Sequence, residues 1–200
     1  MNFAIEHTHD TSPYLIVTGR KHTLKHRLII VESGLALVRL GKQEYAVEAG
    51  QAFWLPFDCL VSTTYLPNSS ITDVTISARV SGRFSKQAGF VTLSPMLKAT
   101  IAQMGGNNSE EYGQTLKQVI KHECMTLKPS LTLSPLSETL SQWSPTASGS
   151  GLEKEVHLGL LVREARKMKL SGKKDEMIAN ALFAGQVAQF NALYQALIKP

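Results

Sequence analysis

Hydrophobic and polar residues alternate with a period of two along most of the first half of the chain, which predicts β-strands. These segments are rich in Val, Ile, Thr and aromatic residues, as strands generally are. The predicted strands are Tyr14–Thr18, Arg27–Glu32, Leu35–Leu40, Gln43–Glu48, Ala52–Leu55, Val61–Leu66, Ile71–Val80 and Phe90–Leu93. Turn residues such as Gly41-Lys42 separate them. Many short strands at regular spacing are typical of a barrel or a sandwich.

Beyond Pro95 the apolar residues recur every three or four positions, which predicts helices. Ser109 followed by two glutamates is typical of a helix start, because these side chains favour the free N–H groups and the dipole at that end. The apolar face of this helix consists of Tyr112, Leu116, Val119, Ile120 and Leu127. That face packs either against the barrel or against the same helix of a second subunit. In the second case Val119 and Ile120 form the interface of a homodimer.

A stretch rich in Pro, Ser and Thr, from Lys128 to Gly151, predicts a linker around a short helix near Leu136–Trp143. The end of the chain then predicts three helices, at Leu152–Leu170, Asp175–Phe183 and Gln186–Ile198. The expected fold class is therefore α+β, with an N-terminal β-barrel followed by a C-terminal α-helical region. We divide the chain into a barrel at 1–95, a helical segment with the linker at 96–151, and a helical tail at 152–200.

Composition narrows the class of protein. The chain has 200 residues, of which 43% are hydrophobic and 18% charged, and this balance favours a soluble globular protein over a disordered one. No run approaches the roughly 20 apolar residues of a membrane span, and the N-terminus lacks the pattern of a signal peptide. Cys59 and Cys124 match no metal-binding or redox spacing, so we expect two reduced thiols in a cytoplasmic protein.

The net charge of +5 is concentrated near the end of the chain. Residues 163–200 hold seven basic and three acidic side chains, whereas residues 1–162 hold 14 and 13. Lys and Arg gain affinity for phosphates by releasing condensed counterions, so the asymmetry indicates a tail that faces nucleic acid. The alternative is an ordinary solvated helix face.

The spacing of turn residues in the predicted barrel resembles the two motifs of the cupins. Gly34, Gly50 and Pro56 fall on the turn positions of those motifs. The four positions that hold the cupin metal are occupied here by Arg20, His22, Arg27 and Val61. The resemblance implies a double-stranded β-helix barrel. Because a divalent metal needs several convergent imidazoles and carboxylates, we expect no metal and no cofactor. An atypical metal site that uses His22 and His26 is the alternative.

A barrel of this size has room for its own side chains or for one small ligand. We predict that Arg20, His22, Trp54 and Tyr65 line a ligand pocket, provided that the strand register turns them inward. The alternative is that Trp54 and Tyr65 fill the core. The sequence contains no nucleophile elbow, no glycine-rich phosphate loop and no carboxylate pair set apart for acid–base work, so we expect no catalysis.

The tail resembles the second helix-turn-helix unit of the AraC family of transcription regulators. The matching positions are Ala165, Met168, Gly172, Ile178, Ala179, Phe183, Phe190, Tyr194 and Pro200. The family joins a cupin-like sensor barrel and a helical dimerisation segment to two such units, whereas residues 152–200 have room for one. The resemblance implies DNA contacts by Arg166, Lys167, Lys173, Lys174, Gln186, Gln189 and Asn191. The alternative is that the tail is a helical subdomain that packs on the barrel or on a second subunit.

These observations lead to one main prediction and one alternative. We expect a cytoplasmic, homodimeric AraC-like transcription regulator whose metal-free barrel senses an unidentified small molecule and whose shortened tail contacts DNA. The alternative is a stand-alone ligand-binding cupin protein that does not bind DNA.

Overall fold

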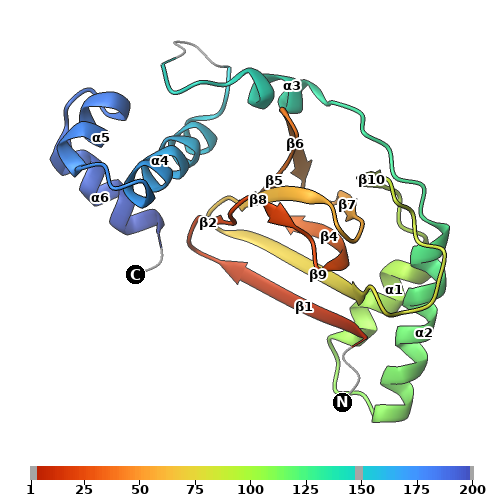
Figure 1. The fold of residues 1–200 in the computed structure, drawn as a ribbon. Helices are drawn as coiled ribbons and strands as arrows, with labels where there is room; N and C mark the ends of the chain where they lie inside the picture. The colour runs from red at the N-terminus through yellow and green to blue at the C-terminus, as the bar shows by residue number, and fades with distance from the viewer. Residues whose placement is uncertain (1–3, 147–150, 199–200) are drawn as a thin grey trace.

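The structure, a computed structural model, describes residues 4–146 and 151–198. Two antiparallel sheets lie between helices (Figure 1). Sheet A has the order β1-β9-β4-β7-β10, and sheet B has the order β2-β8-β5-β6 with β3 also paired to β8. The strands are β1 (Ile5–Ser12), β2 (Ile16–Val17), β3 (Lys21–His22), β4 (Lys25–Ser33), β5 (Leu35–Leu40), β6 (Gln43–Glu48), β7 (Ala52–Leu55), β8 (Leu60–Tyr65), β9 (Ser69–Ser77) and β10 (Gly89–Val91). The helices are α1 (Pro95–Met104), α2 (Glu110–Thr126), α3 (Pro135–Gln142), α4 (Lys154–Leu170), α5 (Asp175–Leu182) and α6 (Val187–Leu197).

The two sheets face each other, and apolar side chains fill most of the space between them. Alternate residues of each strand point into this space, as the period of two requires. The buried residues that meet there are Ile29, Val31, Ala36, Val38, Tyr45, Val47, Phe53, Leu55, Val61 and Ile71. The middle of the barrel is therefore a packed core.

Helices α1 and α2 cover the outer face of sheet A. Leu97 and Ile101 of α1 and Ile120 of α2 pack on Leu28 and Trp54 of the sheet. Ile120 is fully buried in this contact, so it is not available to a second subunit in this arrangement. Packing against the barrel thus accounts for Ile120 and Leu127 of the apolar face of α2, whereas Tyr112 is exposed. Dimerisation stays a prediction.

Helices α3, α4 and the end of α6 cover the outer face of sheet B. Leu37 and Leu66 of the sheet side contact a cluster that includes Leu140 of α3 and Leu160 of α4. The tail helices α4, α5 and α6 lie across the molecule from α1 and α2 (Figure 1). Both sheets therefore have helices on their outer faces, and the tail forms one layer of the fold.

The predicted fold class is confirmed, and the predicted bounds of β5, β6 and β7 match the observed strands. Three elements were not predicted: β1, β3 and α1. β1 carries the polar sequence IEHTHDTS and is mostly exposed, so it lacks the apolar alternation by which a strand is recognised. The start of α1 was readable, because the Ser94 side chain accepts a bond from the Leu97 N–H and Pro95 opens the helix.

Candidate functional site

The predicted metal positions of the barrel do not form a metal site. Arg27 points between the sheets and forms an ion pair with Asp73, whose Oδ2 also accepts from Arg27 Nε at 3.1 Å. Its Nη2 donates to the Tyr65 hydroxyl at 3.2 Å. Burial raises the pKa of Tyr65, and Arg27 only partly offsets that rise. Burial alone would lower the pKa of Arg27, but Tyr65 and Asp73 raise it overall. A guanidinium occupies the position where a ligand carboxylate would be needed, so these residues do not fit a divalent metal.

The two histidines of the alternative metal site differ in their exposure and in their hydrogen-bond partners. His22 is exposed and its Nδ1 lies 2.9 Å from Asp58 Oδ1. His26 is half-buried and its Nδ1 accepts the Phe57 N–H at 3.0 Å. Within residues 4–146 and 151–198, no group of three His, Cys, Asp or Glu side chains comes together in a way that could hold a metal ion.

The four residues predicted to line a ligand pocket do not meet. Tyr65 faces the barrel interior and bonds Arg27, and Arg20 lies on the opposite, outer side of sheet B, beside α4. The expectation that Trp54 faces the interior is wrong. Trp54 is fully buried under the helices of sheet A, and its Nε1 donates to the Ser85 carbonyl at 3.1 Å. β7 is buried on both faces, so no apolar alternation indicates which of its residues point inward.

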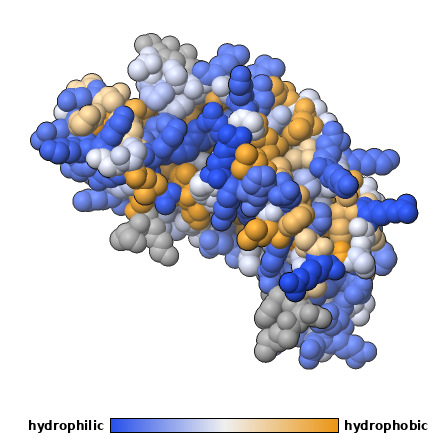
Figure 2. All heavy atoms as spheres, in the orientation of Figure 1, coloured by the Kyte–Doolittle hydropathy of each residue, from blue (hydrophilic) through white to orange (hydrophobic). Residues whose placement is uncertain are grey.

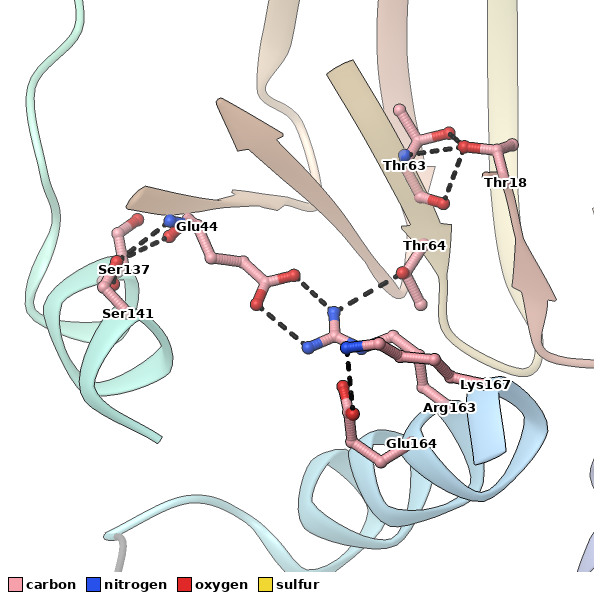
Figure 3. Close-up of polar contacts among 9 residues, drawn as sticks. All are labelled: Thr18, Glu44, Thr63, Thr64, Ser137, Ser141, Arg163, Glu164 and Lys167. Atoms are coloured by element: carbon pink, nitrogen blue, oxygen red, sulfur yellow. Dashed lines mark hydrogen bonds and ion pairs between the residues drawn. The ribbon is translucent and has the colours of Figure 1, made fainter. Parts of the chain in front are cut away.

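The surface between sheet B and helices α3, α4 and α6, called the seam from here on, brings distant parts of the chain together. Its centre is Glu44 of β6, whose carboxylate forms a two-pronged ion pair with Arg163 of α4. The side chains of Glu44 and Arg163 are only 5% and 11% exposed. Arg163 also reaches Thr64 Oγ1 on β8 at 3.5 Å (Figure 3). One guanidinium therefore connects the tail to two strands.

Helix α3 covers the free edge of sheet B at the same point. β6 is the last strand of the sheet, so the outward N–H groups of Glu44 and Ala46 have no strand to bond. Ser141 Oγ accepts from the Glu44 N–H at 2.9 Å (Figure 3). Ser137 Oγ accepts from the Ala46 N–H at 2.9 Å. The short helix predicted within the linker thus supplies hydrogen-bond acceptors to the N–H groups of the edge strand.

Two clefts open on the seam. The basic cleft, of about 480 Å³, lies between sheet B and α4 and is lined by cations from both. The cations are Arg20, Arg39, Arg163, Arg166 and Lys167. The apolar cleft, of about 760 Å³, lies between the sheet and the α4–α6 pair. Its apolar lining comes mainly from Leu35, Leu66, Leu136, Val156, Leu158, Leu193 and Leu197. Figure 2 shows strongly hydrophilic residues where the tail meets the sheets.

The helices α5 and α6 of the tail are joined by a short turn and pack around a small core. Ile178 of α5 and Phe183, which directly follows α5, pack on Phe190 of α6. Ala184 and Gly185 in the turn have φ values of 48° and 80°. The far end of α6 is docked on the barrel, because the Leu197 carbonyl accepts the Leu15 N–H at 2.7 Å.

The residues predicted to contact DNA fall into two groups. Gln186, Gln189, Lys173 and Lys174 are exposed on the tail, and Asn191 is half-buried. Arg166 and Lys167 line the basic cleft instead, and Arg166 Nη1 donates to the Val17 carbonyl of β2 at 2.7 Å. Two predicted classes of residue, the ligand contact Arg20 and the DNA contacts Arg166 and Lys167, therefore share one cleft.

Glu44, Ser137 and Ser141 are not among the site residues predicted from the sequence. An acid within a strand is ordinary, so nothing marked Glu44. The two serines lie four residues apart on one face of a short helix, but this spacing does not indicate the strand whose N–H groups they bond.

Comparison with protein families and with curated proteins finds no match. Among solved structures, an apo variant of ToxT from Vibrio cholerae is 12% identical over 100% of this chain and 96% of its own, with a TM-score of 0.45. Wild-type ToxT bound to an unsaturated fatty acid is 10% identical over 98% of this chain and 92% of its own, with a TM-score of 0.43. A cupin superfamily protein from Desulfitobacterium hafniense is 8% identical over 38% of this chain and 71% of its own, with a TM-score of 0.35. These values leave the function to be argued from the site. Within the described residues, no helix is long and apolar enough to span a membrane.

Proposed function

We propose that the protein is a cytoplasmic, non-catalytic AraC-like regulator in which a small molecule bound at the seam changes how a helix-turn-helix unit docks on the barrel. The observation that carries this proposal is that α6 lines the apolar cleft with Leu193 and Leu197. A ligand in that cleft touches the sheet and the second helix of the unit at once. It therefore favours one docking arrangement over another, which is what a regulatory ligand must do.

The apolar cleft is better suited to an effector than the barrel interior is. Its volume of about 760 Å³ falls in the range of small-molecule sites, roughly 300–1,000 Å³, whereas apolar side chains fill the middle of the barrel. Leu35 and Leu66 on the sheet side and Val156 on the helix side give it an apolar lining. Glu48, Glu153 and Glu155 lie among its lining residues. An apolar molecule that is neutral or carries a positive charge suits this lining.

DNA contact in this proposal uses the exposed residues of the tail. Gln186 and Gln189 have the side-chain chemistry that reads adenine edges, and Lys173 and Lys174 at the turn before α5 supply phosphate contacts. A mobility-shift assay at low salt, on fragments of the source genome, tests this. The wild type should retard a subset of fragments, and K173Q/K174Q should weaken that binding about tenfold or more. A matched control, Lys98→Gln on α1, should leave the binding unchanged.

A second candidate function is supported by the charge of α6. No charged residue lies between Val187 and Leu197, so α6 offers no cation to the phosphates that flank a groove. In this alternative the protein binds its ligand without DNA and acts through protein association. If no fragment is retarded at low salt, the first proposal fails and this alternative replaces it.

A further inference from the structure

The basic cleft carries more positive charge than its own acids neutralise. Its lining includes five cations and one carboxylate, Glu164. Two of the cations are already paired: Arg163 with Glu44, and Lys167 with Glu164, at 3.6 Å. Within the part of the chain that the structure describes, Arg20, Arg39 and Arg166 form no ion pair with a carboxylate.

Arg166 is the most telling of the three, because it is half-buried. Its Nη1 donates to the Val17 carbonyl at 2.7 Å, which is a neutral acceptor. Removing a guanidinium from water without a counter-charge is costly, and an anion that binds beside it offsets part of this cost. The uncompensated charge of Arg166 therefore lies inside the cleft, whereas Arg20 and Arg39 are exposed at its wall.

We propose that the basic cleft binds the phosphate group of a small organic phosphate that carries two to three negative charges. Three uncompensated guanidinium groups match that charge, whereas a single carboxylate would leave two of them unbalanced. Guanidinium forks bind phosphate oxygens in pairs. The hydroxyl-bearing residues Ser62 and Thr64 also line the cleft and add hydrogen-bonding groups for the remaining oxygens.

The shape of the cleft favours a small molecule over a nucleic-acid strand. Arg39 belongs to β5 and Arg20 to the loop between β2 and β3, on the sheet side of the cleft, whereas Arg166 belongs to α4 on the other side. A group that contacts all three must enter the space of about 480 Å³ between the walls. A bound phosphate thus bridges sheet B and α4 and strengthens their contact. The inference goes beyond the proposed function, since it concerns the cleft alone and holds even if the chain binds no DNA.

Calorimetric titration of the full chain with inorganic pyrophosphate at low salt tests the proposal, with inorganic phosphate and acetate as further probes. The wild type should bind one pyrophosphate, more tightly than phosphate and far more tightly than acetate. Arg39→Gln and Arg166→Gln should each weaken pyrophosphate binding about tenfold or more. The matched control is Arg83→Gln, because Arg83 is exposed and is not among the residues of this cleft.

Arg39 is exposed on the sheet, so its variant keeps the test valid if Arg166→Gln fails to fold. The proposal is overturned if pyrophosphate does not bind, or if both arginine variants bind it as the control does. It is also overturned if acetate binds as tightly as pyrophosphate. A short DNA duplex that binds more tightly than pyrophosphate, and loses affinity in both arginine variants, would identify the surface as a nucleic-acid contact and would overturn the proposal as well.

Discussion

Glu44 is an acid on an edge strand whose side chain is only 5% exposed. Burying a carboxylate is costly, and the cost is offset here by the two-pronged contact with Arg163. The pair fixes where α4 lies on sheet B, since Arg163 comes from the helix and Glu44 from the sheet. Removing one partner leaves the other charged and buried.

We expect Glu44→Gln to lower the free energy of unfolding by about 3 kcal/mol, because Arg163 loses its counter-charge in a buried place. Urea denaturation measures this. The double variant E44Q/R163M should lose less stability than the single variants E44Q and R163M lose together, because no lone buried charge remains. The matched control is Lys167→Gln, which breaks the pair between Glu164 and a lysine that is 79% exposed and should change stability by less than about 0.5 kcal/mol. If Glu44→Gln and Lys167→Gln lowered the free energy of unfolding equally, the buried ion pair of Glu44 would not stabilise the fold more than an exposed pair does.

His26 makes stability depend on pH. Burial lowers the pKa of His26 below the ordinary value of 6.5, and its Nδ1 accepts the Phe57 N–H, so the folded chain favours the neutral ring. The unfolded chain therefore takes up a proton first as the pH falls. The stability contribution of His26 is complete above about pH 6.5 and is lost as the pH falls below that value, towards the pKa of the folded state.

His26→Asn should flatten this pH dependence, because the amide oxygen can still accept from Phe57 but does not titrate. Thermal unfolding between about pH 8 and pH 5 measures the slope. His122→Asn on the exposed side of α2 is the control and should keep the wild-type slope. An unchanged slope in the His26 variant would show that other groups cause the pH dependence.

At the scale of elements, α3 accepts hydrogen bonds from the edge of sheet B, as a further strand would. Ser137 is fully buried and accepts the Ala46 N–H of β6. Ser137→Ala leaves that N–H without a partner, which costs about 1–3 kcal/mol. The free energy of unfolding should fall by that amount, and the Ala46 amide should exchange faster with deuterium. Thr139→Ala is the control, because its hydroxyl bonds only the Pro135 carbonyl within the helix. Unchanged exchange at Ala46 would remove α3 from this role.

The elements that the sequence predicts are those with a regular apolar pattern. β5 to β7 have strong strand sequences, and α2 has both a capping serine and an apolar face. β1 was not predicted. It is an edge strand in which only Ile5 is buried, so its sequence shows no regular apolar pattern. The bonds between α3 and β6 were beyond prediction, since they join residues that lie far apart in the chain.

At the scale of the molecule, the tail is packed as a layer. Gly159 of α4 lies so close to sheet B that an added Cβ would be 2.8 Å from Leu66 Cδ1. A larger side chain at this position pushes α4 away from the sheet. Arg20 and Arg166 line one cleft only because this docking exists, and for that reason no local pattern in the sequence indicates the basic cleft.

Gly159→Leu should lower the free energy of unfolding by about 1–3 kcal/mol through overpacking at the seam. Gly113→Leu is the matched control, because Gly113 also lies in a helix but an added Cβ there meets nothing within 4 Å. It should hold or raise stability, since Gly is a poor helix former. Denaturant unfolding of both variants makes the comparison, and equal effects would argue against a close contact between α4 and sheet B.

The most direct measurement of tail docking is deuterium exchange at the Leu15 amide of the intact protein, followed by NMR. This N–H donates to the Leu197 carbonyl at the end of α6, so its protection reports that one contact between barrel and tail. With the tail docked, Leu15 should exchange slowly, as the amides of β5 do. Exchange of Leu15 at the rate of a free amide, while the β5 amides stay protected, would show that the tail is not a layer of the fold.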